Sequence, residues 1–166
     1  MDRIVKPTCD QFDEHGDALG VLPAPLRHYG GHAAFQGRAV TVKTFEVNSR
    51  VKELANTPGE GRVIVVDGGA SLRRALCGDV IAAEAAANGW AGIVIWGAVR
   101  DVAQLSRTPI GIMALGHTPA RCVRKGEGEI GATLRIEGVT VAQDDMIVAD
   151  ADGALVFPQG GPQPSS

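Results

Sequence analysis

The chain has 166 residues, which suits a single domain with one hydrophobic core. Its formal net charge of −3 argues against a general nucleic-acid-binding protein, because such proteins usually carry a basic patch. Hydrophobic residues make up 45% of the chain and aromatic residues only 4%, so aliphatic side chains must fill the core.

The cysteines and the hydropathy pattern favour a cytoplasmic protein. Cys9, Cys77 and Cys122 lie far apart, their number is odd and no CxxC motif occurs, which is typical of reduced thiols. No signal peptide is expected, because residues 1–3 lead into no apolar run. The most apolar stretch, residues 90–99, is too short to span a membrane, so no membrane partner is expected.

The first third of the chain predicts a helix, a loop, a strand and a second helix. Thr8 is a candidate N-cap for a helix over residues 9–15. Residues 16–32 are rich in Gly, Pro and His and predict a loop. Residues 39–45 are rich in β-branched side chains and predict a strand. Asn48 is then a candidate N-cap for the next helix.

The middle of the chain alternates strands with helices. Residues 62–67 contain a continuous apolar run, as expected of a strand that is covered on both faces. The elements expected after it are a glycine turn at 68–70, a helix at 80–88, a strand at 91–96, a turn at 97–100, a short helix at 101–106 and a strand at 109–115. This alternation predicts a βαβ core with parallel strands.

The C-terminal part is richer in strands. Two hairpins are expected, one over residues 133–141 and one over residues 146–157. The sequence therefore predicts one α/β domain over residues 1–157, with a parallel βαβ core and a β-rich C-terminal part. Residues 158–166 are rich in Pro, Gly, Ser and Gln and are expected to form a disordered tail.

A candidate anion site lies at the start of the helix expected at residues 80–88. In open α/β sheets, ligands bind outside the carboxyl ends of the strands, and the free N–H groups of a helix's first turn attract anions. A substrate carboxylate is therefore expected on the backbone of Gly78, Asp79, Val80 and Ile81. Gly78 has no Cβ and lets the chain approach a ligand closely.

A second pair of residues, Arg100-Asp101, follows the next expected strand. Asp101 is a candidate ligand for Mg²⁺ or Mn²⁺, since one or two carboxylates can hold such a cation together with substrate and water oxygens. Arg100 would put a fixed positive charge beside a developing enolate oxygen, and Asp79 would hold a water for proton transfer. Both aspartates are also typical N-caps, so the local pattern leaves a purely structural role open.

Other motifs point to no further chemistry. Residues 65–69 lack the G-x-G-x-x-G spacing of a nucleotide-binding loop, so a tight turn is expected there. The four histidines show neither HExxH nor another metal-binding spacing. No Cys–His pair is visible, which disfavours Cys77 or Cys122 as a nucleophile.

The whole pattern resembles the RraA-like family, whose members include 4-hydroxy-4-methyl-2-oxoglutarate aldolases and the regulator of ribonuclease activity A. The strongest block of similarity is residues 65–76, Val-Val-Asp-Gly-Gly-Ala-Ser-Leu-Arg-Arg-Ala-Leu. The resemblance runs from about Cys9 to Phe157, and its other marks are residues 29–31, 39–43, 48–49, 61–63, 88–90 and 138–141.

The resemblance implies an activity as well as a fold. Aldolase members carry the pattern D-x20-R-D, which Asp79, Arg100 and Asp101 reproduce here. It implies a class II aldolase in which residues 78–81 and Arg100 bind the pyruvate moiety and Asp101 binds a divalent metal cation. Such an enzyme cleaves small 2-keto acids of the 4-hydroxy-4-methyl-2-oxoglutarate type to pyruvate and also decarboxylates oxaloacetate. The resemblance further implies a swivelling α/β domain in homotrimers or dimers of trimers, with active sites at subunit boundaries.

Departures from the family pattern leave the proton donor open. Val47 stands where an acidic residue is common, and His32 stands where Arg often follows two glycines. The chain also ends without an obvious equivalent of the acidic residue that longer aldolases supply from a neighbour. Two rival functions are a protein-binding regulator of ribonuclease E without catalysis and a methyltransferase, which would need the missing glycine loop. The intact D-x20-R-D favours the aldolase.

Overall fold

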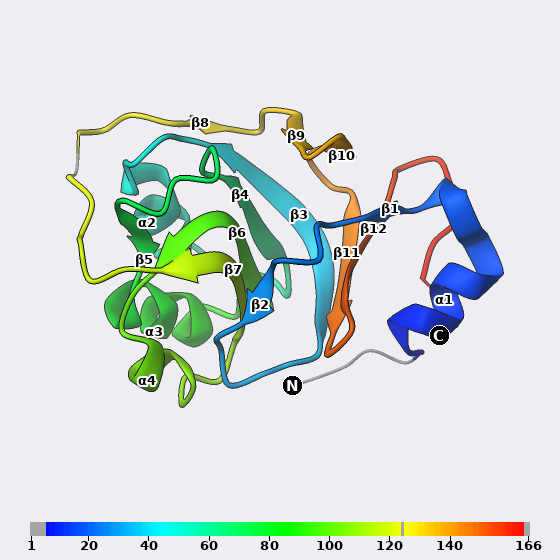
Figure 1. Ribbon diagram of the computed structural model, residues 1–166, viewed down its shortest axis with the longest axis horizontal. Helices are drawn as coiled ribbons and strands as arrows, with labels where there is room; N and C mark the ends of the chain where they lie inside the picture. Colours follow the sequence, from blue (N-terminus) through cyan, green and yellow to red (C-terminus); the bar gives the residue numbers. More distant parts are fainter. Residues whose placement is uncertain (1–5, 124, 165–166) are drawn as a thin grey trace.

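Parallel strands form the centre of the molecule. The structure, a computed structural model, describes residues 6–123 and 125–164, and within these ranges its body is a curled, ten-stranded mixed sheet (Figure 1). Four parallel strands lie side by side in it, in the order β3 (Phe35–Lys43), β4 (Val63–Asp67), β6 (Gly92–Val99) and β7 (Gly111–His117). The predicted βαβ core with parallel strands is confirmed.

Other strands extend this core on both sides. Three antiparallel strands continue the sheet beyond β3, one pairs with β7, and two short strands pair with β6 and β3. In that order they are β11 (Met146–Asp150), β12 (Gly153–Phe157), β1 (Gly20–Val21), β2 (Arg27–His28), β5 (Ala75–Cys77) and β8 (Glu129–Ile130). A separate hairpin joins β9 (Leu134–Ile136) to β10 (Val139–Val141). Both hairpins predicted for the C-terminal part are confirmed.

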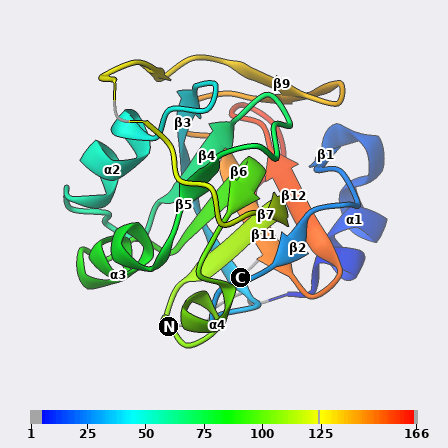
Figure 2. The ribbon, with the colours of Figure 1, turned by 60° about the vertical axis from the view of Figure 1, so that its left-hand side comes forward.

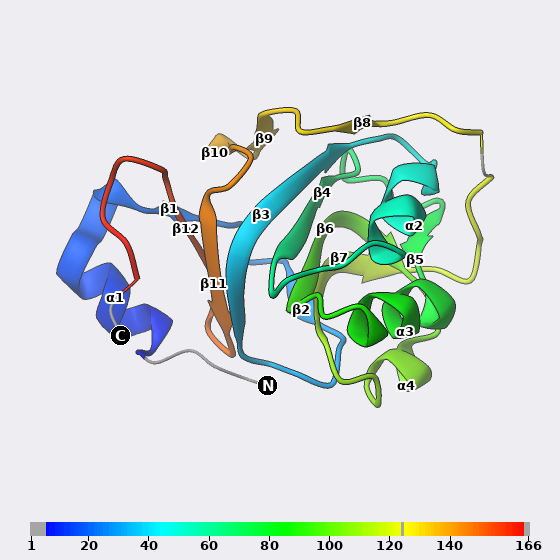
Figure 3. The ribbon, with the colours of Figure 1, turned by 180° about the vertical axis from the view of Figure 1, so that it is seen from behind.

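Helices gather at two places on the sheet. α2 (Ser49–Ala55), α3 (Asp79–Ala87) and α4 (Val102–Leu105) lie on one face of the parallel strands, as Figure 2 and Figure 3 show from two sides. α1 (Thr8–His15) and the 3-10 helix η1 (Gly16–Ala18) lie at the far end, where α1 packs against β11 and β12.

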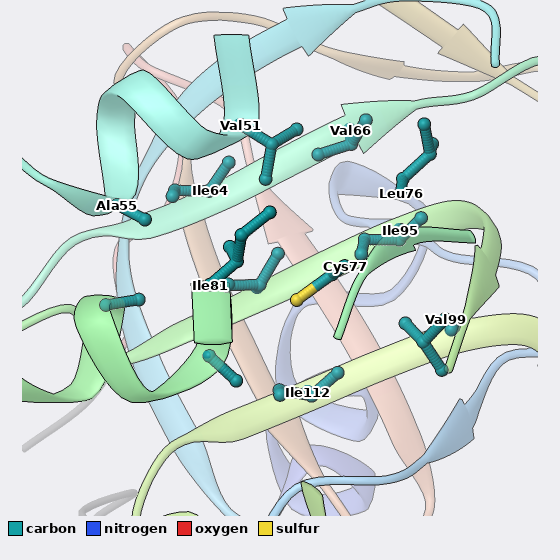
Figure 4. Close-up of a cluster of buried hydrophobic side chains, with 14 of the residues drawn as sticks. Val51, Ala55, Ile64, Val66, Leu76, Cys77, Ile81, Ile95, Val99 and Ile112 are labelled. Atoms are coloured by element: carbon teal, nitrogen blue, oxygen red, sulfur yellow. The ribbon is translucent and has the colours of Figure 1, made fainter. Parts of the chain in front are cut away.

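Alternate residues of the central strands build two cores. Ile64 and Val66 of β4 face α2 and α3 and pack with their apolar side chains (Figure 4). Val63 and Val65 point to the opposite face, where they meet side chains from the C-terminal strands. All four residues are fully buried, so the continuous apolar run of this segment reflects coverage of both faces, as the sequence predicts.

The ring of Phe35 packs over two glycines on neighbouring strands. Gly92 of β6 and Gly111 of β7 are register partners, and the buried ring of Phe35 lies over both of them. A Cβ on Gly111 would lie 2.0 Å from Phe35 Cδ1, and one on Gly92 would lie 2.4 Å from Phe35 Cδ2. The absence of two side chains therefore forms the slot for this ring.

Three local predictions are wrong because distant partners decide them. Thr8 begins α1 rather than capping it, and the carboxylate of Asp150 accepts its N–H at 2.8 Å and its hydroxyl at 2.6 Å. Residues 16–32 are not all loop, since they contain η1, β1 and β2, and the two strands are fixed by pairing with β12 and β7. Residues 97–99 continue β6 instead of turning, because β5 and β7 pair with them.

The C-terminal tail and the helices bear on two further predictions. No described helix is long and apolar enough to cross a membrane. Residues 158–164 contain neither helix nor strand, and residues 165–166 lie outside the described residues. The disorder expected for residues 158–166 and the domain boundary at Phe157 stay predictions.

We predict that Gly111→Ala lowers the free energy of unfolding by about 1–3 kcal/mol, because the added methyl group would overlap the Phe35 ring in a filled core. Urea unfolding measures this change. Adding Phe35→Leu to the same chain should recover part of the loss, since the smaller side chain makes room. An unchanged unfolding midpoint for Gly111→Ala alone would contradict this account of the packing.

Candidate active site

Two chain reversals meet at the carboxyl ends of β5 and β6. These strands are parallel, with Cys77 opposite Val99, so the residues that follow leave the sheet side by side. The N–H of Arg100 donates to the carbonyl of Cys77 at 3.0 Å, which holds the two turns together. The two pairs singled out in the sequence, Gly78-Asp79 and Arg100-Asp101, therefore lie next to each other.

A hydrogen bond joins the two aspartates. Asp101 Oδ2 accepts the backbone N–H of Asp79 at 3.0 Å. Asp101 has a left-handed backbone conformation (φ 60°, ψ 43°), which is uncommon outside glycine but tolerated by Asp. The capping interpretation is wrong for Asp79, which begins α3 after the N-cap residue Gly78 and makes no cap hydrogen bond. Asp101 does occupy the N-cap position of α4, but its carboxylate makes no cap hydrogen bond to that helix and instead accepts the first N–H of α3.

Gly78 makes room for this hydrogen bond. A Cβ at Gly78 would lie 2.5 Å from Asp101 Oδ2 and 3.2 Å from Arg100 Cγ. Any side chain would displace the carboxylate. The close approach that the sequence predicts at Gly78 is therefore first an approach of two side chains from the neighbouring turn.

All the predicted site residues line one pocket of about 530 Å³. They are Gly78, Asp79, Val80, Ile81, Arg100 and Asp101. Sequence reasoning did not assign the other lining residues to the site; they are Asn48, which it predicted as an N-cap, Cys122, which it considered only as a nucleophile, and Ala75, Arg121 and Val123. Arg121 reaches the pocket because it forms an isolated parallel bridge with Ala75, and a single bridge leaves no periodic pattern in a sequence.

The positive charge of Arg100 is held beside the Asp101 carboxylate. Arg100 Nε lies 3.8 Å from Asp101 Oδ2, and Arg100 Nη1 donates to the carbonyl of Pro119 at 3.5 Å. Both side chains are partly exposed and line the pocket. The guanidinium thus has a defined place at the pocket wall and keeps donors for a bound anion.

The start of α3 offers two free donors to the pocket. The N–H of Asp79 is taken by Asp101, and the N–H of Ala82 donates to the carbonyl of Gly78 at 3.1 Å. The N–H groups of Val80 and Ile81 lie between them and donate to no described residue. A carboxylate in the pocket would satisfy both groups at the positive end of a nine-residue helix.

The cysteines beside the pocket are poor nucleophiles. Burial, with the nearby charges of Asp101 and Asp79 adding to it, raises the pKa of the Cys77 thiol to about 12. Burial likewise raises the pKa of Cys122 to about 11, and its Sγ donates to the carbonyl of Ala75 at 3.1 Å. A raised pKa favours the protonated thiol at neutral pH, and a thiol is a weaker nucleophile than a thiolate.

The donor set fits a hard cation whose coordination a ligand completes. Between residues 6 and 164, leaving out residue 124, no three His, Cys, Asp or Glu side chains gather to hold a metal by themselves. Asp101 Oδ1 has no hydrogen-bond partner among the described residues, and the exposed carboxylate of Asp79 belongs to the same pocket. One or two carboxylates, completed by substrate and water oxygens, suit Mg²⁺ or Mn²⁺.

Comparison with known protein families settles the relationship. The profile described as RraA-like, Aldolase/RraA, matches residues 6–156. The chain belongs to the RraA-like family. It is 46% identical over 158 residues to a protein of Laribacter hongkongensis, with 95% of this chain and 98% of that one covered. A protein of Alkalilimnicola ehrlichii is 47% identical over 150 residues, with 90% and 93% covered. Both relatives carry the provisional name 4-hydroxy-4-methyl-2-oxoglutarate aldolase.

Solved structures confirm the RraA-like fold. The RNA-processing inhibitor RraA from Thermus thermophilis superposes with a TM-score of 0.89 at 39% identity, covering 95% of this chain and 97% of that one. A structure described as S-adenosylmethionine:2-dimethylmenaquinone methyltransferase, from Geobacillus kaustophilus, gives 0.88 at 40% identity, covering 91% and 94%. Because three different activities are attached to these similar chains, the fold alone does not choose among them.

We predict that Asp101→Ala lowers the free energy of unfolding by about 1 kcal/mol or more, since it removes the acceptor for the Asp79 N–H and forces Ala into a left-handed conformation. Asp101→Asn keeps an acceptor and tolerates this conformation, so it should stay within about 0.5 kcal/mol of the wild type. Urea unfolding compares the two variants. Equal losses would rule out the hydrogen bond as the stabilising contact.

Proposed function

We propose that this protein is a divalent-metal-dependent lyase of the class II aldolase type. It would cleave 4-hydroxy-4-methyl-2-oxoglutarate-type substrates to pyruvate and would also decarboxylate oxaloacetate. The observation that carries the proposal is that Asp79, Arg100 and Asp101 line one pocket beside two unpaired N–H groups at the start of α3. The provisional names of the relatives, at 46% and 47% identity, support it.

Binding and charge stabilisation are divided between the two turns. The substrate carboxylate would lie on the N–H groups of Val80 and Ile81, where the dipole of α3 favours an anion. Arg100 would stand beside the keto oxygen, which gains negative charge as the carbon–carbon bond breaks. A fixed donor at such an oxygen typically lowers the barrier by about 3–4 kcal/mol. A divalent cation held by Asp101 would supply Lewis-acid chemistry at the same oxygen.

Asp79 would handle the proton. Its carboxylate is exposed and lines the pocket, so it can hold a water molecule there. That water would take the proton of the aldol hydroxyl during cleavage and would return a proton to the enolate carbon of pyruvate. Decarboxylation of oxaloacetate leaves the same enolate, so the same residues would serve both reactions.

The proposal includes a cytosolic homotrimer or dimer of trimers. Val80 and Val123 line the pocket and are 58% and 53% exposed, and a second copy over this rim would remove their apolar surface from water. The three free cysteines support a reducing compartment.

A second candidate function is regulation of ribonuclease E by direct binding. The likeness to an RNA-processing inhibitor, at 39% identity and a TM-score of 0.89, favours it. Calorimetric titration with ribonuclease E, run beside the lyase assay, separates the candidates, because association without lyase activity would favour the regulator. Binding of S-adenosylmethionine would favour a methyltransferase, although the chain lacks G-x-G-x-x-G.

We predict release of pyruvate from both 4-hydroxy-4-methyl-2-oxoglutarate and oxaloacetate with Mg²⁺ or Mn²⁺, and its loss with EDTA. Lactate dehydrogenase and NADH report the pyruvate. Asp101→Asn should reduce turnover by about 100-fold or more while the protein stays folded, since it removes the charged ligand. Metal-dependent turnover that survives this substitution would exclude Asp101 as the metal ligand. No pyruvate from either substrate would reject the aldolase.

We also predict that Arg100→Lys lowers kcat by about 10- to 100-fold, because a lysine cannot reproduce the planar fork of donors. Arg107→Lys is the matched control, since Arg107 is exposed and does not line the pocket, and its kcat should stay unchanged. A wild-type rate for Arg100→Lys would remove Arg100 from the mechanism.

A further inference from the structure

A second set of polar groups lines the same pocket and has no part in the steps above. Asn48 stands just before α2, and Arg121 follows β7 in the segment that pairs with Ala75. Neither side chain belongs to the two turns that carry Asp79, Arg100 and Asp101.

The amide oxygen of Asn48 is buried and has no partner among the described residues. Asn48 is 8% exposed and lines the pocket, yet its Oδ1 accepts no hydrogen bond from that part of the chain. It occupies the N-cap position of α2 but makes no cap hydrogen bond, so it does not stabilise that helix start. Buried polar atoms are almost always paired, because leaving one unpaired costs free energy. A ligand group in the pocket would supply the missing partner.

The backbone that carries the Arg121 side chain is held by hydrogen bonds to β5. The chain around it is tied to the start of β5: the N–H of Ala75 donates to the carbonyl of Ala120 at 2.7 Å, and Cys122 Sγ donates to the carbonyl of Ala75 at 3.1 Å. The guanidinium itself forms no ion pair or hydrogen bond with any described residue. Its five donors therefore stay available to an anion in the pocket.

The charges of the pocket suit a ligand with two carboxylates. Arg100 and Arg121 balance Asp79 and Asp101, so the lining side chains sum to zero. The divalent cation of the proposed function would bring the site to +2. A keto acid with one carboxylate supplies only one negative charge, whereas a dicarboxylic keto acid supplies two. The α3 donors hold one carboxylate, and Arg121 remains for the other.

We infer that Arg121 binds the second carboxylate of the substrate and that Asn48 binds its aldol hydroxyl. This inference rests on the proposed function and assigns residues to the part of the substrate beyond the keto acid group. An Arg suits that place because its planar fork pairs with both oxygens of a carboxylate.

Binding of two matched acids tests Arg121. 2-Oxoglutarate and 2-oxopentanoate have the same carbon chain and differ in the distal carboxylate. Calorimetry with Mg²⁺ should show that Arg121→Ala weakens binding of 2-oxoglutarate by about 10- to 100-fold and changes that of 2-oxopentanoate little. Arg121→Lys should restore part of the difference. Arg135→Ala is the control, because Arg135 is exposed on β9, outside the pocket, and its loss changes the net charge equally.

The outcomes of this titration are distinguishable. Equal effects of Arg121→Ala on both acids, or no effect on either, would overturn the inference and leave the proposed function standing. Failure of the wild type to bind either acid would overturn the proposed function, and the inference with it.

Two reactions of one enzyme test Asn48. The aldol substrate carries the hydroxyl and oxaloacetate does not, so Asn48→Ala should lower kcat/KM for aldol cleavage by about tenfold and leave decarboxylation nearly unchanged. The melting temperature should not fall, because Asn48 Oδ1 has no hydrogen bond to any residue that the structure describes. Equal losses in both reactions, or a lower melting temperature, would assign Asn48 a structural role instead.

Discussion

The hydrogen bond from the Asp79 N–H to Asp101 Oδ2 is the constraint on which the site depends. It links two turns that are 22 residues apart in the chain, and it exists because β5 and β6 run parallel and end together. Gly78 leaves space for it, and the left-handed conformation of Asp101 aims the carboxylate at it. The same bond occupies one oxygen of Asp101 and one N–H of α3, so it decides which oxygen and which N–H groups are left for ligands.

Much of the fold could be predicted because the hydrophobic periodicity and composition of a segment indicate which of its faces are buried. Residues 63–66 are apolar at every position because two cores cover β4, and such a run can be recognised in a sequence. The alternation of strands and helices in turn predicts that Asp79 and Asp101 reach one edge of the sheet. Their contact with one pocket is confirmed, whereas their roles in catalysis and metal binding stay predictions.

What escaped sequence reasoning depends on pairings between distant residues. β5 has three residues, and Arg121 joins it through one bridge, so neither forms a pattern along the chain. The partner that satisfies Thr8 is Asp150, which lies at the other end of the chain. Asn48 was predicted as an N-cap from its residue type, but its side chain makes no cap hydrogen bond. Local preference places such residues near a helix start, to within a residue, and cannot say what they contact.

Pairing on both edges of β6 limits movement at the site. This strand is paired with β4 along its first half, with β5 beyond Trp96 and with β7 on its other edge, so few of its backbone groups are free. Separating it from its neighbours would break both cores at once, which makes local opening there nearly as costly as unfolding the whole domain. Arg100 and Asp101 directly follow the last residue of this strand, Val99. A ligand in the pocket would therefore meet backbone that the sheet already holds in place, which would limit the ordering entropy lost on binding.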